Sequence, residues 1–304
     1  MLTKKTTAYL ILTLLLAITI AWALTSGASS RGLADLNILF NIRLPRIISA
    51  LLGGAALAVS GAFFQAALRN PIAEPALLGI SSAANLFALI GGLLLPALFS
   101  AKIIAAILGG CLAFLTLASL QKNLDPYRLI LVGVALNAVF TALGNLLNPN
   151  QNAFSLATST WTTTLFLAVI TLLGLAVALV ISPFANYLKV SDRQLQTLGL
   201  SPKQLRISLL SLATLLAASS TACIGILAFI GIIVPHHARF LLGHDYRQLV
   251  PFCALGGAEL LLLTDTIGRL VIAPNEISAN IILAIIGGPF LIYILLGRKT
   301  DAHS

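Results

Sequence analysis

The chain has 304 residues, of which 59% are hydrophobic and only 9% are charged. An ordinary soluble domain carries about 25% charged residues. The composition therefore excludes a water-soluble enzyme of this length, and it excludes a disordered chain, which would be rich in charge and poor in apolar residues. The net charge of +9 would favour a nucleic-acid partner in a soluble protein. Here the basic residues lie singly or in pairs between apolar runs, as in the loops of membrane proteins, so we expect a polytopic protein in a lipid bilayer with no nucleic-acid partner.

Ten apolar runs, bounded by charged residues or by Pro and Gly, follow one another along the chain. Each is close to the length of about 20 residues that crosses the hydrocarbon of a bilayer. The first run follows two lysines, as a signal peptide would, but it lacks a convincing polar region after it, so we interpret it as an uncleaved helix. The almost unbroken stretch 204–242 is too long for one span, and we divide it at Ile224–Gly225. The runs are 8–24, 46–67, 77–99, 101–120, 129–147, 162–182, 204–223, 225–242, 249–270 and 278–296.

The basic residues also indicate which side of the membrane each loop faces. When the N-terminus is placed inside, most of the 18 Lys and Arg residues fall in inner segments, which favours both termini inside and an even number of spans. We expect one transmembrane domain over residues 1–304. The longest inner loop, about 183–203, is polar and has helix-compatible segments between two prolines. Short helices on the membrane surface would explain it, and a plain connecting loop is the alternative.

The sequence lacks the motifs of several kinds of chemistry. It has no P-loop, HExxH, GxSxG or CxxC pattern, so we expect no catalytic residue, no metal site and no ATP bound by this chain. His236 and His237 are adjacent and therefore point to different faces of a helix. Glu259 is the one good candidate for an ionisable residue at mid-membrane depth, and it leaves an ion-coupled secondary carrier as an alternative.

Three stretches carry a resemblance that covers nearly the whole chain after residue 40. They read RLPRIISALLGGAALAVSGAFFQAALRNPIAEPALLG at 43–79, GILAFIGIIVPHHARFLLGHDYRQLVP at 225–251 and LTDTIGRLVIAPNEISANIILAIIGGP at 263–289. Together they resemble the permease subunits of bacterial ABC importers for iron-siderophores, haem and cobalamin. The resemblance implies the BtuC-like fold of type II importers, which is an all-α integral membrane fold with about ten transmembrane helices and both termini cytoplasmic.

The same resemblance implies location and partners. The chain would lie in the bacterial cytoplasmic membrane and pair with a second permease subunit, either a copy of itself or a close paralogue. A cytoplasmic ABC ATPase dimer would bind the ATP, and an extracytoplasmic binding protein would deliver the substrate. We expect an iron chelate, ferric siderophore or haem, and keep cobalamin as the alternative within the family. A membrane-embedded enzyme would need a cluster of acids or histidines that we do not find.

Residue roles follow from the resemblance as expectations. Exposed arginines would dock the binding protein, although arginines that snorkel to the interface would have the same pattern; they are Arg43, Arg46 and Arg269. Residues of the 183–203 loop would contact the ATPase, with a glycine allowing a sharp turn; they are Ser191, Asp192, Leu198 and Gly199.

Two further sets concern the pathway. Small or neutral polar side chains on the fifth and tenth spans would line it, with helix packing as the alternative; they are Asn137, Thr141, Asn145, Asn280, Ala284 and Gly287. The turn between the fourth and fifth spans would form a cytoplasmic gate, or would be a plain loop; its residues are Asn123, Leu124, Asp125 and Pro126.

Overall fold

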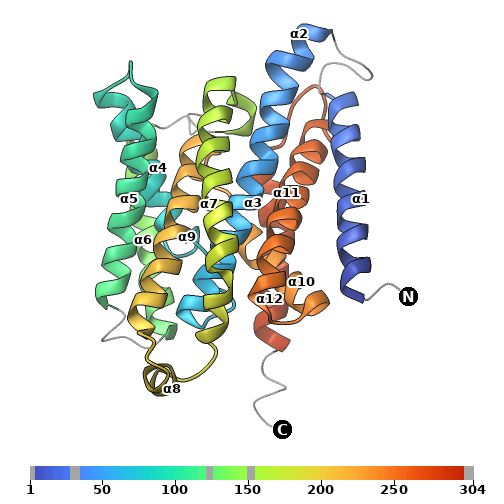
Figure 1. Ribbon diagram of the computed structural model, residues 1–304. Coiled ribbons are helices and arrows are strands. Elements are labelled where there is room, and N and C mark those ends of the chain that lie inside the picture. The colour runs from blue at the N-terminus through green and yellow to red at the C-terminus, as the bar shows by residue number, and fades with distance from the viewer. Residues whose placement is uncertain (1–3, 28–34, 121–125, 149–154, 298–304) are drawn as a thin grey trace.

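The computed structural model describes residues 4–27, 35–120, 126–148 and 155–297. These residues are almost entirely helical, and the helices stand side by side as one bundle (Figure 1). The elements are α1 (Lys4–Thr25), α2 (Leu36–Ile38), the π-helix η1 (Leu39–Arg43), α3 (Leu44–Leu68), α4 (Ile80–Leu94), α5 (Phe99–Leu120), α6 (Pro126–Leu147), the 3₁₀ turn η2 (Leu156–Thr158), α7 (Trp161–Tyr187), α8 (Asp192–Thr197), α9 (Pro202–Ile224), α10 (Ile230–Leu242), α11 (Tyr246–Leu270) and α12 (Ala279–Gly297).

The ten predicted spans correspond to ten apolar helices in the described part of the chain. Eight helical segments are long and apolar enough to cross a membrane, and α4 and α10 are shorter apolar helices. The division at Ile224–Gly225 is confirmed, because α9 ends at Ile224 and Gly225 takes a φ of 86°. The prediction that the next span starts at Gly225 is wrong. Residues 225–229 are not helical, and α10 begins at Ile230.

Helix α3 lies in the middle of the bundle and is buried along almost its whole length (Figure 1). Two glycine pairs allow the neighbouring helices to approach its backbone. A Cβ atom on Gly54 would lie 2.1 Å from the carbonyl oxygen of Gly257 on α11, and one on Gly61 would lie 2.3 Å from that of Gly231 on α10. Small residues at helix crossings permit this separation in membrane proteins, where close packing supplies much of the attraction between helices.

Helix α7 is longer than the sequence indicated. Pro183 lies inside the helix, which continues to Tyr187, so the inner loop begins five residues later than predicted. A proline cannot donate the backbone hydrogen bond to the residue four positions earlier. Pro183 therefore leaves the carbonyl of Leu179 without its usual backbone donor, and the hydroxyl of Ser182 donates to this carbonyl instead, at 3.0 Å. Hydrogen bonds of this kind from Ser side chains allow prolines inside transmembrane helices.

The two ends of the bundle differ in what they carry. We call them the α2 end and the α8 end, at the top and bottom of Figure 1. Helix α1 starts at the α8 end and α12 finishes there. This agrees with the prediction that both termini lie on one side.

Candidate functional site

A cavity of about 800 Å³ is lined by residues of α3, α4, α6, η2, the α9–α10 connection and the start of α12. This volume lies within the range of about 300–1,000 Å³ that is typical of small-molecule sites. Charged side chains in the lining are confined to Arg46, Asp265 and Glu276 among the described residues. The neutral polar residues of the lining are Asn85, Asn137, Thr141, Asn145, Asn148, Ser155, Thr158, Ser278 and Asn280.

Four of the six predicted pathway residues line this cavity. Asn137, Thr141 and Asn145 recur at four-residue intervals and so share one face of α6, and Asn280 lies in the first turn of α12. Ala284 and Gly287 are not in the lining. A Cβ atom on Gly287 would lie 2.2 Å from the ring of Phe229, so this glycine serves close packing of α12 against the α9–α10 connection.

The wall of the cavity includes two stretches of non-helical backbone, 69–79 and 225–229. Glu74 in the first stretch is 2% exposed, and its carboxylate accepts the backbone N–H of Phe229 in the second at 2.9 Å. Phe229 is the N-cap of α10 and has no capping side chain of its own. A carboxylate is favourable at this position because unpaired N–H groups and the helix dipole both attract negative charge. Sequence reasoning missed Glu74, since its partner lies 155 residues away.

The charged residues of the cavity belong to an ion-pair network at the α2 end. Arg46 donates from Nε to both carboxylate oxygens of Asp265, at 3.1 and 3.0 Å, and from Nη2 to one of them at 2.8 Å. Its Nη1 donates to Glu276 at 2.8 Å. Arg269 lies 3.3 Å from the other side of Asp265. A carboxylate held by a forked guanidinium is a strong, directional contact, so the network fixes α3 against α11 and the connection between α11 and α12.

The three arginines expected to be exposed are buried, and that expectation is wrong. Arg43, Arg46 and Arg269 are 4%, 9% and 3% exposed. Arg43 donates to the carbonyl of Leu24 at 2.6 Å, and Arg269 donates to that of Ser26 at 3.3 Å. Cations stabilise a helix C-terminus, because its last carbonyls lack partners. Arg43 and Arg269 therefore hold the end of α1, and Arg46 pairs with acids 219 and 230 residues away in sequence. Docking of the binding protein remains a prediction.

Helix α8 is short, and the residues next to it cap both of its ends. Ser191 and Gln194 form a reciprocal capping box at its start. At its end Gly199 takes a φ of 73°, and the N–H groups of Gly199 and Leu200 donate to the carbonyls of Gln196 and Leu195, both at 3.0 Å. This is the hydrogen-bond pattern with which a left-handed glycine ends a helix.

The side chains of the α8 turn point in two directions. Leu195 is fully buried, whereas Leu198 is 67% exposed. Leu198 is thus an exposed apolar side chain next to the glycine that ends α8. Of the four predicted coupling residues, Leu198 therefore presents the largest apolar surface.

The side chain of Asp192, another predicted coupling residue, is already hydrogen-bonded to two arginines of the same chain. Arg206 on α9 donates to both of its oxygens at 3.0 and 2.8 Å, and Arg69 donates to one at 2.8 Å. Desolvation alone would raise the pKa of the Asp192 carboxyl, but the hydrogen bonds and charges of Arg206, and then of Arg69, outweigh it and lower the pKa.

A second polar cluster joins the end of α7 to the α10–α11 turn. Asn186 donates to Asp245 at 2.7 Å and accepts the backbone N–H of Tyr246 at 3.1 Å. Lys189 donates to Asn186 at 2.6 Å, and its ammonium lies 5.6 Å from the centre of the Tyr246 ring. Burial lowers the pKa of Lys189, and the nearby charge of Asp245 opposes this. The cluster therefore connects the end of α7 and the loop after it to the start of α11.

The remaining predicted residues add little to the site. Asn123, Leu124 and Asp125 lie outside the described residues, and Pro126 is the first residue of α6.

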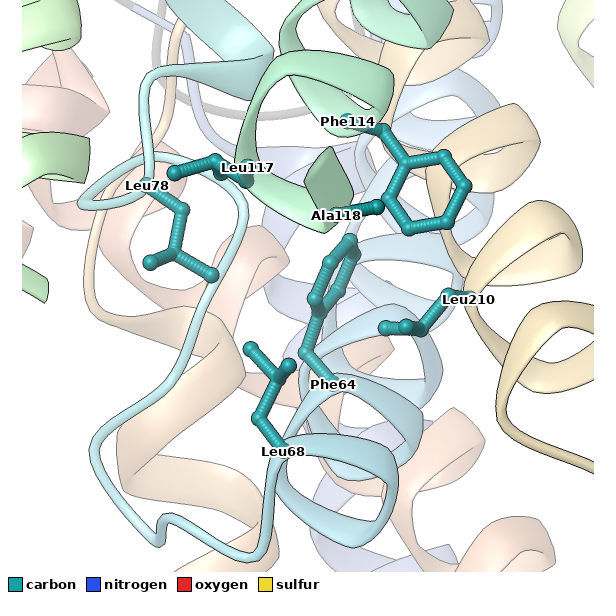
Figure 2. A pocket seen from close by; sticks show the side chains of 7 residues that line it. All are labelled: Phe64, Leu68, Leu78, Phe114, Leu117, Ala118 and Leu210. Carbon is teal, nitrogen blue, oxygen red and sulfur yellow. The ribbon is translucent and has the colours of Figure 1, made fainter. Parts of the chain in front are cut away.

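A second, apolar pocket of about 10 Å³, with room for about one water molecule, is formed by side chains of α3, α5, α9 and the segment before α4 (Figure 2). Among the described residues, no three His, Cys, Asp or Glu side chains are grouped as a metal site would require.

A bundle of apolar helices that encloses a polar cavity and exposes a capped turn at one end defines a membrane permease. The model of the FecCD transport family matches residues 6–297. The chain belongs to that family and is a multi-pass permease subunit of a bacterial ABC importer, a transport component.

Individual relatives agree with this assignment. The chain is 41% identical over 262 residues to a Staphylococcus aureus protein named "Probable heme-iron transport system permease protein IsdF", covering 84% of this chain and 81% of that one. A solved structure of a metal-chelate type ABC transporter, in an inward-facing conformation, is 31% identical with a TM-score of 0.80, and the match covers 94% and 97% of the two chains. PsaBC from Streptococcus pneumoniae shares the fold at 17% identity with a TM-score of 0.58, over 82% and 89% of the chains.

Proposed function

We propose that the chain conducts an iron chelate, with haem as the first candidate, across the bacterial cytoplasmic membrane. The cavity of about 800 Å³ carries this proposal. Its wall is largely neutral, which suits a large rigid cargo, because weak contacts allow both entry and release. The relatives named for heme-iron transport support haem as the cargo.

The cavity also supports a second permease subunit as a partner. Thr141 and Asn145 on α6 line the cavity and yet are exposed in the single chain. Polar residues at membrane depth face a bundle interior or a water-filled space rather than lipid. A second copy, or a close paralogue, placed against this face would close the pathway from the lipid side.

The ATPase and the binding protein would act at opposite ends. The exposed Leu198 turn of α8 gives the ABC ATPase dimer an ordered surface, and the α2 end would receive the binding protein. ATP would be bound by the ATPase, and this chain would hold no cofactor. Most basic residues of the described loops, including Arg69, Lys189 and Arg206, lie at the α8 end, which supports a cytoplasmic position for it.

Reconstitution tests the function directly. The chain is purified with the ATPase and binding protein that co-purify with it, placed in vesicles, and given haem, a ferric hydroxamate or cobalamin with and without ATP. We expect haem uptake that requires ATP and stops when the ATPase is inactivated. Uptake of cobalamin alone would assign the other cargo of the family. Uptake driven by a cation gradient in vesicles with this chain alone would replace the proposal by an ion-coupled carrier.

A further inference from the structure

The side chain of Arg69 spans the gap between the end of α3 and the α8 segment, residues 188–201. Its Nε donates to the carbonyl of Leu188 at 2.9 Å. Its Nη2 donates to the carbonyl of Val190 at 2.6 Å and to the carboxylate of Asp192 at 2.8 Å. One guanidinium thus binds acceptors on three alternate residues, 188, 190 and 192, at the point where the chain enters α8.

The backbone of Arg69 is strained at the same point. Arg69 is the C-cap of α3 with a φ of 49°, one of two non-glycine residues with a positive φ among those described. This conformation is unfavourable for an L-residue other than glycine, because its Cβ lies too close to the following carbonyl oxygen. Strain of this kind persists where surrounding contacts fix the residue, and it is concentrated at functional positions. The left-handed cap turns the chain sharply at the end of α3, beside residues 188–192.

Stability alone does not account for the arrangement. The side chains of Arg69 and Asp192 are 41% and 42% exposed, and an ion pair exposed to this extent contributes little to stability. What the contacts provide instead is direction, because a planar guanidinium fixes the relative position of the groups it binds. Lysine, with one flexible ammonium, cannot reproduce that geometry.

Arg69 and Arg206 bind the same carboxylate but connect it to different helices. Arg206 lies on α9, which follows α8 directly, so its contact stays within one local unit. Arg69 connects that unit to α3, and it is the side chain through which α3 hydrogen-bonds residues 188–201 among those described. The other end of α3 carries Arg46 in the wall of the cavity.

We propose that Arg69 is a positioning residue that ties the α8 segment to α3, so that a displacement of α8 by the ATPase moves α3 together with it. Helix α3 packs tightly against α10 and α11 through its glycine pairs. A displacement of α3 would therefore also move these two helices, which border the cavity. The proposal rests on the proposed function, in which α8 meets the ATPase.

The test compares Arg69→Ala with wild type in vesicles that contain the complete complex, measuring haem uptake and ATP hydrolysis together. We expect assembly with the ATPase and ATP hydrolysis to be retained, while haem taken up per ATP hydrolysed falls about tenfold, the size of a typical coupling between sites. Arg247→Ala, which removes an exposed arginine from the first turn of α11, is the matched control and should behave as wild type. An unchanged ratio of uptake to hydrolysis in Arg69→Ala would overturn the proposal.

A second variant covers the case in which Arg69→Ala does not assemble. Arg69→Lys keeps the charge but reaches one acceptor at a time, so we expect an assembled complex with a reduced ratio. Arg69→Lys with the wild-type ratio, or loss of assembly in both variants, would overturn the proposal. Failure of the proposed function is a separate result, because it would be seen as absent haem uptake by the wild-type complex.

Discussion

Asp265 makes a quantitative prediction about the ion-pair network. Its side chain is 2% exposed, accepts three hydrogen bonds from Arg46 and pairs with Arg269. Asp265→Ala would leave two buried guanidinium groups without their shared acid. Removing one partner of a buried ion pair costs about 3–5 kcal/mol, so we expect the free energy of unfolding to fall by that amount.

Glu276 supplies the matched comparison within the same network. It accepts one hydrogen bond from Arg46, and its side chain is 32% exposed. Because solvent screens such a pair, Glu276→Ala should cost no more than about 1 kcal/mol. Unfolding the purified chain by titration with sodium dodecyl sulfate, monitored by far-ultraviolet circular dichroism, measures both losses.

The same measurement separates a structural arginine from a docking arginine. Arg46→Glu would place a third acid beside Asp265 and Glu276, so we expect an unfolding defect at least as large as that of Asp265→Ala. Equal losses for Asp265→Ala and Glu276→Ala would refute the buried-network reasoning. An Arg46→Glu chain that folds like wild type but no longer takes up substrate would instead support docking.

Three further predictions concern the glycines and the α8 segment. Gly54→Ala should lower the thermal stability in detergent by about 1–3 kcal/mol, because its Cβ would meet the backbone of Gly257, whereas Gly288→Ala, with open space around it, should not. Gly199→Trp should uncouple ATP hydrolysis from uptake, while Gly199→Asn should stay coupled, because Asn tolerates the left-handed backbone at a φ of 73°. The pKa of the Asp192 carboxyl is lowered from 3.8 in the folded chain. Asp192 therefore contributes stability that is present above pH 3.8 and is lost as the pH falls through the lowered pKa. A spin label on α8 should gain mobility in that acidic range.

Each of these has a result that contradicts it. Equal stability of Gly54→Ala and Gly288→Ala would show that α3 and α11 are not in backbone contact. Normal coupling in Gly199→Trp would remove the turn from the ATPase interface. A label whose mobility in Asp192→Asn follows pH as in wild type would show that another group titrates there.

The number of spans could be predicted from the sequence because the length of an apolar run is read from consecutive residues and compared directly with the thickness of a bilayer. The same local logic placed the break at Gly225, where glycine permits a backbone that other residues avoid. It failed at Pro183, which resembles a helix end in sequence but is accommodated inside α7 by the hydroxyl of Ser182. A hydroxyl one position before a proline is a signal that could have indicated this.

The candidate site divides in the same way. Asn137, Thr141 and Asn145 were found because helical spacing places them on one face. The arginines were misplaced because a single positive charge near a span end has the same pattern whether it faces water or a buried acid. The partner of Arg46 is 219 residues away, and nothing local to residue 46 reports on it.

The carboxylate of Glu74 has a mechanical consequence for the permease. Its hydrogen bond joins two non-helical stretches of the bundle, so residues 69–79 and 225–229 should move as one unit in the cavity wall. A displacement of α3 that begins at Arg69 would then carry the start of α10 with it, and the cavity would change shape against α6 and the beginning of α12. Because Thr141 and Asn145 of α6 line the cavity and are exposed in the single chain, opening and closing would be a property of the assembled pair rather than of either subunit.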